Sequence, residues 1–330
     1  MDIVTLGEVL IDMFPMQVGQ AMGEVEAFTP KAGGAPANVA VAARRLGRES
    51  AFIGKVGEDL FGEYLKWVLD EEGVETRGMR FDPEARTTMA IIAMPDEDSA
   101  EFVFYRNPGA DQRLAADELD HALLQNTRVF HFGSLSLTDE PARSATVAAA
   151  RMARQAGAIV SYDLNYRPAL WKDPDQALTQ AQEVLPLVDV LKVNEGEVAL
   201  LCGLGSVSIR DLEGVGAATR CLLQAGPRLV VVTLGKDGSY FVTREAQGYI
   251  PGFKVDTIDA VGCGDAFTAG LLSQLAVMED WQSQLTAESL TRMLIFANAV
   301  GALTSLKRGA LPALPTLDEV NHFMQERKSL

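Results

Sequence analysis

The sequence predicts an α/β fold: a doubly wound, mostly parallel sheet flanked by helices, with a small β-sheet lid. Three observations carry this prediction. Strand-like and helix-like segments alternate at both ends of the chain, an order typical of parallel sheets. Two neighbouring strand-like runs at residues 86–106 interrupt the alternation. A glycine turn at residues 262–264 opens an apolar helix, as anion-binding turns of α/β proteins do.

The first part of the chain reads as strand, helix, strand, helix. Residues 2–6 and 51–54 are short apolar runs typical of buried strands. A helix is expected between Pro36 and Gly47, directly after the pair Gly33-Gly34. A second helix is expected over residues 58–72, closed by a glycine.

Two polar residues in this part have two possible roles each. Asp12 lies in an apolar run, so it is either a turn residue at a strand end or an acceptor for a polar ligand. Asn38 lies one turn into the helix that follows Gly34. A residue there usually faces solvent, but behind a glycine turn its amide could meet a ligand hydroxyl.

The interruption reads as an antiparallel hairpin with strands at 87–94 and 101–105 and a polar turn at 95–99. We expect a lid of about residues 8–30 and 86–108, inserted into a single domain that spans residues 1–330. Arg106 leaves this hairpin. It is either a surface charge or, if the lid closes over a site, a residue that reaches the ligand.

The alternation resumes at residue 129. Strands are expected at 129–133, 159–163, 188–193 and 228–233, helices at 140–156, from 194, from 264 and at 287–306, a hairpin at 240–250, and a last helix after residue 315. Asp163, Asn165 and Arg167 follow one strand directly, where ligands of open α/β sheets bind. Asn194 and Glu197 have capping-box spacing, which we favour over the alternative that Glu197 orients water on a cation.

The glycine turn at Gly262-Cys263-Gly264 is the strongest local signal for a ligand. Glycine permits close approach to the backbone, and the first N–H groups of the helix lack partners and lie at the positive end of its dipole. The turn therefore predicts a phosphate site. Asp265 follows immediately. Locally it is either a helix cap or a general base that takes a proton from a hydroxyl attacking the phosphate.

Composition excludes several classes of protein. With 29 basic and 45 acidic residues the formal charge is −16, which disfavours nucleic acid and anionic membranes as partners. The three cysteines (Cys202, Cys221 and Cys263) fit no disulfide framework and no zinc spacing, so we expect a reduced, cytoplasmic setting. The N-terminus shows no signal-like segment.

Two common nucleotide motifs are missing. The chain has no Gly-x-x-x-x-Gly-Lys-Ser/Thr loop and no Gly-x-Gly-x-x-Gly after the first strand. The three histidines are scattered, which gives no metal cluster. His131 lies in an apolar strand and is interpreted as a core residue rather than a catalyst.

Three motifs in order, Gly33-Gly34-Ala-Pro-Ala-Asn38, Asn194-x-x-Glu197 and Gly262-Cys-Gly-Asp265, resemble the ribokinase-like (PfkB-type) carbohydrate kinases. The resemblance covers essentially the whole chain. The signature commonly written Asp-Thr-Thr-Gly-Ala-Gly-Asp in that family stands here as Asp259-Ala-Val-Gly-Cys-Gly-Asp265. The departures keep both glycines and both acids. Within the family, the segments at 7–12, 104–111 and 296–303 are most similar to fructokinases.

The resemblance implies a kinase that transfers the γ-phosphoryl group of ATP to a sugar hydroxyl with Mg²⁺, fructose being the first candidate. Asp265 would be the base. The anion hole would be formed by Gly262, Cys263 and Gly264, and the sugar would be held by Asp12, Gly33, Gly34, Asn38, Arg106 and Arg167. The ATP site would be lined by Asn194, Thr233, Gly235, Gly264 and Asn298. Glu197 would bind Mg²⁺ through water, and a potassium-type ion would be held by Asp259 with main-chain oxygens of Val261 and Gly309.

Other readings stay open. A 2-keto-3-deoxygluconate kinase would draw on Arg106 and Arg167 for its acid substrate, and an aminoimidazole riboside or nucleoside kinase would share the mechanism. A non-catalytic sugar or nucleotide sensor belongs to a different class. The apolar lid hairpin could pair with a second copy to form a homodimer. Cys263, at a helix N-terminus, could have a lowered thiol pKa, or it could simply be a small residue where alanine would serve.

Overall fold

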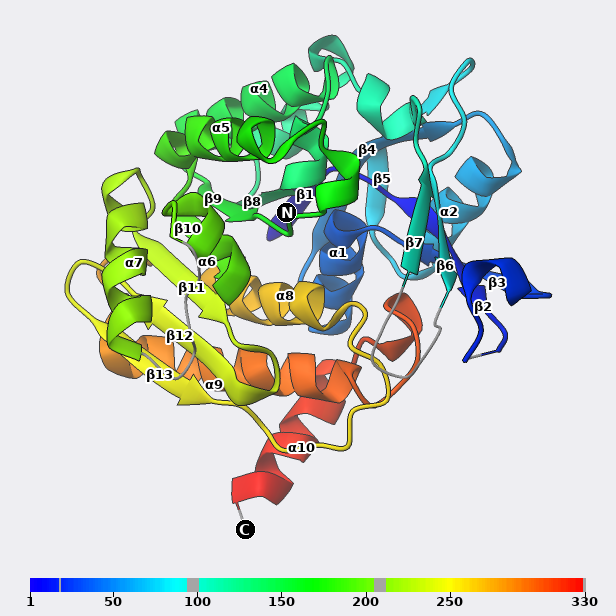
Figure 1. The fold of residues 1–330 in the computed structure, drawn as a ribbon. Coiled ribbons are helices and arrows are strands. Elements are labelled where there is room, and N and C mark those ends of the chain that lie inside the picture. The colour runs from blue at the N-terminus through cyan, green and yellow to red at the C-terminus, as the bar shows by residue number, and fades with distance from the viewer. Residues whose placement is uncertain (18, 94–100, 205–211, 329–330) are drawn as a thin grey trace.

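The computed structural model describes residues 1–17, 19–93, 101–204 and 212–328. A nine-stranded sheet runs through its centre in the order β13-β12-β11-β10-β9-β8-β1-β4-β5. The strands from β11 to β5 are parallel to their neighbours, whereas β12 and β13 join antiparallel at one edge. Helices cover both faces (Figure 1). The α/β fold class with a mostly parallel, doubly wound sheet is thus confirmed.

The strands of this sheet are β1 (Ile3–Leu6), β4 (Ser50–Gly57), β5 (Glu75–Asp82), β8 (Val129–Gly133), β9 (Ile159–Asp163), β10 (Val190–Asn194), β11 (Leu229–Thr233), β12 (Gly238–Val242) and β13 (Gln247–Pro251). Their near-continuous apolar runs are typical of strands buried on both faces. All of them except β5 had a counterpart in the sequence prediction. The strand β5 lies at the sheet edge and mixes charged and apolar residues, so its pattern is weak.

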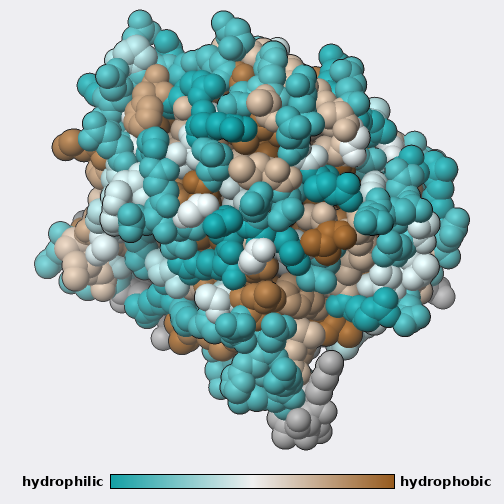
Figure 2. Space-filling model, turned by 180° about the vertical axis from the view of Figure 1, so that it is seen from behind, coloured by the Kyte–Doolittle hydropathy of each residue, from teal (hydrophilic) through white to brown (hydrophobic). Residues whose placement is uncertain are grey.

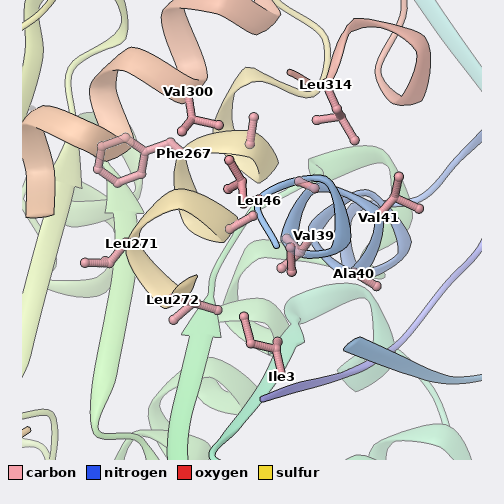
Figure 3. Close-up of a cluster of buried hydrophobic side chains, with 14 of the residues drawn as sticks. Ile3, Val39, Ala40, Val41, Leu46, Phe267, Leu271, Leu272, Val300 and Leu314 are labelled. Atoms are coloured by element: carbon pink, nitrogen blue, oxygen red, sulfur yellow. The ribbon is translucent and has the colours of Figure 1, made fainter. Parts of the chain in front are cut away.

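Successive residues of a strand point to opposite faces, and two hydrophobic cores result. Ile3 belongs to the core under α1 (Ala35–Arg45), α2 (Leu60–Glu71), α8 (Cys263–Leu275), α9 (Ala287–Thr304) and α10 (Leu317–Lys328). Val4 belongs to the core under α3 (His121–Gln125), α4 (Ala142–Gln155), α5 (Pro174–Val184), α6 (Glu195–Leu201) and α7 (Leu212–Gln224). Figure 3 shows how side chains of α1 and α8 share the first core. This packing fixes the two helix N-termini relative to each other.

A second, four-stranded sheet lies beside the main one, next to α1 and α2 (Figure 1). Its order is β3-β2-β6-β7, with β2 (Leu10–Pro15), β3 (Phe28–Gly33), β6 (Met89–Ala93) and β7 (Glu101–Tyr105). The pairs β2–β3 and β6–β7 are antiparallel, which confirms the predicted hairpin strands. The expected turn at residues 95–99 lies outside the described residues. Asp12 is in the middle of β2, so its interpretation as a strand-end turn residue is wrong.

All three cysteines are free, and two of them lie close together in the fold. Cys202 and Cys221 are 19 residues apart, and their sulfur atoms lie 2.9 Å from each other. The packing of α6 against α7 brings them together, and the spacing of the cysteines in the sequence could not predict this. His131 is buried, its Nδ1 is 3.0 Å from the Ser161 hydroxyl, and burial lowers its pKa to about 4, as a neutral core histidine requires.

The surface in Figure 2 is mostly hydrophilic, with hydrophobic residues scattered over it. Within the described residues, no helix combines the length and hydropathy that a membrane crossing needs.

Candidate active site

Polar side chains gather at the carboxyl ends of three neighbouring strands. Asp163 ends β9, Asn194 ends β10 and Thr233 ends β11. Strand register sets Asp163 beside Lys192 and Asn194 beside Thr233. Parallel strands end at one edge of the sheet, which is where open α/β folds bind ligands. The arrangement places the predicted residues of segments 163–167, 194–197 and 233–235 along a single edge.

The N-terminus of α8 faces this edge. Gly262 is the N-cap residue, with φ 79°, and no side chain caps the helix. A Cβ on Gly262 would come within 2.8 Å of the Ala310 Cβ, so both the backbone angle and the space demand glycine. No side chain caps the N–H groups that open α8, and Cys263 N donates to the Ala260 carbonyl only at a long 3.3 Å. A helix start without a side-chain cap is suited to binding an anion.

Asp265 is the third residue of α8 and does not cap it, so the helix-cap interpretation is wrong. Its Oδ2 accepts a 2.7 Å hydrogen bond from Nδ2 of Asn38, and both residues are buried. Burial raises the pKa of Asp265 to about 6; the Asn38 hydrogen bond, Lys192 and Arg167 oppose this rise, while Asp163 adds to it. A carboxyl group poised near neutral pH suits proton abstraction.

Asn38 is held by the first turns of α1 and does not face solvent. Its Nδ2 binds Asp265, while its Oδ1 is buried without a partner among the described residues. A buried amide oxygen without a partner costs free energy, and a ligand hydroxyl would relieve that cost. Asn38 thus has one amide group bound to Asp265 and an amide oxygen left to accept a ligand hydroxyl.

Asp12 lies close to the glycine pair that precedes α1. A Cβ on Gly33 would lie 2.0 Å from Oδ2 of Asp12, and one on Gly34 (φ 107°) would lie 2.5 Å from the Glu8 carbonyl. Burial and the charge of Asp265 raise the pKa of Asp12 to about 7, against opposing effects from Arg167 and Lys31. Two acidic groups from distant segments therefore share one electrostatic environment, as in other sites of acid–base chemistry.

The two predicted arginines differ. Arg167 is exposed, and its charge acts on both Asp12 and Asp265. Arg106 is buried: it donates to Asp111 Oδ2 at 2.8 Å, to the Thr138 hydroxyl at 2.9 Å and to the Leu135 carbonyl at 2.9 Å. It is therefore neither a surface charge nor a freely reaching lid residue. Its contact with a substrate stays a prediction.

Asn194 and Glu197 form the capping box of α6, as favoured from the sequence. Glu197 N donates to Asn194 Oδ1 at 2.9 Å, and Asn194 N donates to Glu197 Oε2 at 2.8 Å. Glu197 Oε1 also accepts from Tyr166 N at 2.7 Å. Both carboxylate oxygens of Glu197 are therefore occupied by backbone N–H groups, and its contact with Mg²⁺ through water stays a prediction.

Asp259 joins the glycine turn to the segment before α10. Its Oδ1 accepts from Val261 N at 3.0 Å and its Oδ2 from Gly309 N at 2.8 Å. The carboxylate brings together the three residues predicted around a potassium-type ion. Within the described residues, no group of three or more acidic, cysteine or histidine side chains could hold a metal, so a cation here would depend on main-chain oxygens.

The remaining predicted ATP residues flank the strand ends. Thr233 is half-buried with its hydroxyl 3.4 Å from the Val193 carbonyl. Gly235 has φ 56° and open space where a Cβ would stand. Asn298 in α9 is buried, and its Nδ2 lies 3.3 Å from the Ile250 carbonyl. Thr233 and Gly235 border the site edge directly, while Asn298 is tied to the end of β13.

Sequence reasoning missed two residues near the site. Lys192 in β10 is buried and forms an ion pair with Asp163 at 2.9 Å. Lys31 in β3 influences Asp12 and approaches Gly309, where an added Cβ would be 3.0 Å from its Nζ. A basic residue within a buried strand was the available signal for Lys192. Lys31 is half-buried in the short strand β3, whose mixed pattern gave no signal.

Cys263 corrects one expectation. Burial, followed by the charges of Asp259 and Asp265, raises the pKa of its thiol to about 12. The pKa of this thiol is therefore raised, not lowered as its place at a helix N-terminus suggested. The alternative interpretation, a small residue where alanine would serve, fits the structure.

Comparisons with known proteins agree with this geometry. The model of the pfkB family of carbohydrate kinases matches residues 1–317. An Arabidopsis thaliana protein named "Probable fructokinase-6, chloroplastic" is 44% identical over 322 residues, which cover 98% of this chain and 82% of that protein.

Two solved structures are closely similar. Fructokinase from Xylella fastidiosa with bound ATP superposes with a TM-score of 0.88 at 36% identity, covering 99% of both chains. A double mutant of fructokinase from Vibrio cholerae O395, with fructose, ADP and potassium ion bound, gives a TM-score of 0.85 at 34% identity, covering 97% of both. With a family model that spans nearly the whole chain and relatives well above 30% identity, the chain belongs to the pfkB family of carbohydrate kinases.

Proposed function

We propose that this chain phosphorylates fructose with ATP and produces fructose 6-phosphate and ADP. One observation carries the proposal: the buried carboxylate of Asp265, bound to Asn38, beside the glycine turn that opens α8. A base within reach of both a hydroxyl-binding amide and an anion-binding helix N-terminus is the minimum arrangement for phosphoryl transfer to an alcohol.

In this reaction Asp265 takes the proton of the sugar hydroxyl as its oxygen forms a bond to the γ-phosphorus. The bond between that phosphorus and the bridging oxygen breaks, and ADP leaves. The N–H groups of Gly262, Cys263 and Gly264 would stabilise the charge that develops on the transferred group. Preorganised donors of this kind lower a barrier by about 3–4 kcal/mol each.

The sugar would be held from two sides. Asp12, Gly33, Gly34 and Asn38 supply acceptors and close backbone approach, and Arg167 balances the charge of the two acids. On the other side, Asn194, Thr233, Gly235 and Asn298 would line the site for ATP. Mg²⁺ would be held through water by Glu197, where it would neutralise phosphate charge. A potassium-type ion would lie near Asp259, Val261 and Gly309; the relative from Vibrio cholerae binds such an ion.

Fructose is favoured over an acid substrate by the charges in the site. Asp12 and Asp265 would repel the carboxylate of 2-keto-3-deoxygluconate, and Arg106, which could have offset them, is paired with Asp111. Arg167 alone remains for that task. The high identity to proteins named as fructokinases points to the same sugar.

The substrate is tested by a coupled assay of ADP release with MgATP and K⁺. Fructose, 2-keto-3-deoxygluconate, ribose, adenosine and aminoimidazole riboside are compared at equal concentrations. We expect a strong rate with fructose alone. A stronger rate with another compound would replace fructose but keep the mechanism, whereas binding of sugar without any phosphorylated product would support the sensor.

The second sheet, here taken to be the lid, is also proposed as the contact of a homodimer. The strand β7 is an edge strand, and Phe102, Val103 and Tyr105 on it are 46%, 45% and 57% exposed. An exposed apolar edge invites pairing with another strand. We expect Val103→Lys to lower the mass measured by sedimentation equilibrium, while Val277→Lys, at another exposed apolar residue, leaves it unchanged. A wild-type monomer would contradict this proposal.

The cytoplasm is the proposed location, on the grounds of cysteine content alone.

A further inference from the structure

Lys192 occupies an unusual place beside the glycine turn. It lies in β10, two residues before Asn194, and its side chain is 8% exposed. A Cβ added to Gly264 would come within 3.2 Å of the lysine Nζ. The ammonium group therefore borders the first turn of α8, where the transferred phosphoryl group would bind.

The charges around this ammonium group are unbalanced. Asp163, Glu197 and Asp265 are all buried near Lys192, and their charges keep its pKa raised although burial opposes this. The described residues hold no second buried lysine or arginine in contact with these three acids. The phosphates of a nucleotide would add more negative charge next to these three acids, so a fixed cation is required there to stabilise them.

The hydrogen bonds of Lys192 leave one donor available. An ammonium group has three N–H bonds. Two of them go to Asp163, at 3.2 Å to Oδ1 and 2.9 Å to Oδ2. Asp163 also lies against α8, where Oγ1 of Thr268 is 3.4 Å from its Oδ2. Asp163 thus orients Lys192 toward the turn.

We propose that Lys192 is a catalytic residue that donates its third N–H to the γ-phosphoryl group during transfer, with Asp163 as its positioning residue. This proposal rests on the proposed function. Lys192 keeps its proton throughout, since the proton of the sugar hydroxyl goes to Asp265. Its charge stabilises the transferred group as the bond to ADP breaks, which is how phosphate-binding lysines act in other kinases.

The test compares Lys192→Met with Lys55→Met. Lys55 is a matched control, because it is also a buried lysine paired with carboxylates, at 3.3 Å to Asp82 and 2.7 Å to Glu118. We expect Lys192→Met to lower kcat by about 100- to 1,000-fold. The Kd of ADP should stay within about threefold, while a non-hydrolysable ATP analogue binds more weakly. Lys55→Met should lower the thermal midpoint only.

A pH profile adds a readout that a structural role would not give. Lys192 lowers the pKa of Asp265, so its removal should move the acid limb of kcat/KM to higher pH. Because Lys192→Met leaves Asp163 buried and unpaired, it could unfold the chain. The double variant Asp163→Asn/Lys192→Met removes both charges and keeps the test valid.

Two results would overturn the proposal. One is a folded single or double variant with kcat near wild type. The other is an equal loss of affinity for ADP and for the ATP analogue, which would show that Lys192 maintains the structure of the site and does not contact the γ-phosphate. If wild-type protein phosphorylates none of the sugars, the proposed function fails instead, and the two nucleotide affinities still decide whether Lys192 contacts the γ-phosphate.

The pair Cys202 and Cys221 supports a second, independent inference. Cys202 follows α6 and is half-buried, Cys221 lies in α7 and is exposed, and their sulfur atoms are 2.9 Å apart. We infer that Cys202 and Cys221 form a reversible disulfide with each other. The oxidant is a small disulfide such as glutathione disulfide. The exposed Cys221 attacks one sulfur of glutathione disulfide and releases a first glutathione. Cys202 then loses its proton, attacks the Cys221 sulfur and releases the second glutathione. Burial and Cys221 raise the pKa of the Cys202 thiol to about 12, so this second step should be the slower one and should speed up as pH rises.

Mass spectrometry tests this step. Incubated with glutathione disulfide, the wild type should lose two hydrogens, regain them with dithiothreitol, and unfold a few degrees higher when oxidised. Cys202→Ser should stop at a glutathione adduct on Cys221. Cys263→Ser should still lose two hydrogens. A wild type that stops at the adduct, or that does not react, would contradict the assignment.

Discussion

Asn38 Nδ2 and Asp265 Oδ2 form a hydrogen bond of 2.7 Å across 227 residues of sequence. The bond joins the first turn of α1 to the first turn of α8. It connects the expected sugar-binding segment to the expected base, so a hydroxyl that binds Asn38 lies beside the group that removes its proton. The predictions below depend mainly on this pairing.

Removal of the amide should make the base harder to ionise. Burial raises the pKa of Asp265 and the Asn38 hydrogen bond opposes this rise; the net pKa is about 6. A hydrogen bond to a charged group contributes about 1.5–3 kcal/mol. Asn38→Ala should therefore move the acid limb of the kcat/KM profile to higher pH and raise KM for the sugar. An unchanged limb in a variant with raised KM would separate Asn38 from the base.

Removal of the neighbouring acid should leave the pKa of Asp265 nearly unchanged. Burial and the charge of Asp265 raise the pKa of Asp12 to about 7, so Asp12 is mostly protonated at the pH where Asp265 titrates. A base acts in its deprotonated form, so wild-type kcat/KM should fall as pH drops through about 6. Asp12→Asn should leave this fall near pH 6 while it weakens sugar binding. A shift of the fall to lower pH would show that Asp12 is ionised in the free enzyme and raises the pKa of Asp265.

The glycine turn should not accept alanine. Gly262→Ala adds a Cβ within 2.8 Å of Ala310 at φ 79°. Gly157→Ala is the control, because Gly157 has φ 89° and an added Cβ would have no atom within 4 Å. That variant therefore suffers only the backbone strain, about 1–2 kcal/mol, and no steric clash. We expect Gly262→Ala to be less stable than the control in urea and to lose about 100-fold in kcat through displaced N–H groups. Equal stability and normal kcat would rule out this tight turn.

Arg106 should matter for stability. Arg106→Met leaves Asp111 buried without its partner, which costs about 3–5 kcal/mol. Arg292→Met breaks an exposed pair with Glu288 and should cost about 0.5 kcal/mol or less. Urea unfolding compares the two. If Arg106→Met is stable and only raises KM for the sugar, the arginine contacts the substrate, as the sequence suggested.

The sequence predicted the elements better than their contacts. Apolar runs and glycine turns located nearly every strand of the main sheet, and the order of motifs located Asp265 and the turn before it. Neither the Asn38–Asp265 bond nor the Asp163–Lys192 pair was predicted. Both join segments distant in sequence, and only the packing of α1 against α8 and the register of β9 with β10 create them.

Burial was the second quantity that local patterns could not supply. Asn38 looks like a solvent-facing helix residue and Arg106 like a loop charge, yet both are buried. Asp265 has the sequence position of a helix cap, but Gly262 takes that position. In each case the local preference is weak, about 1 kcal/mol for a cap, and tertiary packing outweighs it.

The most direct test of the account is the Asp265→Asn variant. Asparagine keeps the size of the side chain but cannot take the proton, so kcat with fructose should fall by about 100- to 10,000-fold, while the Kd of ADP and the thermal midpoint stay close to wild type. If turnover is near normal in the folded variant, Asp265 is not the base, and the mechanism proposed for this site is wrong.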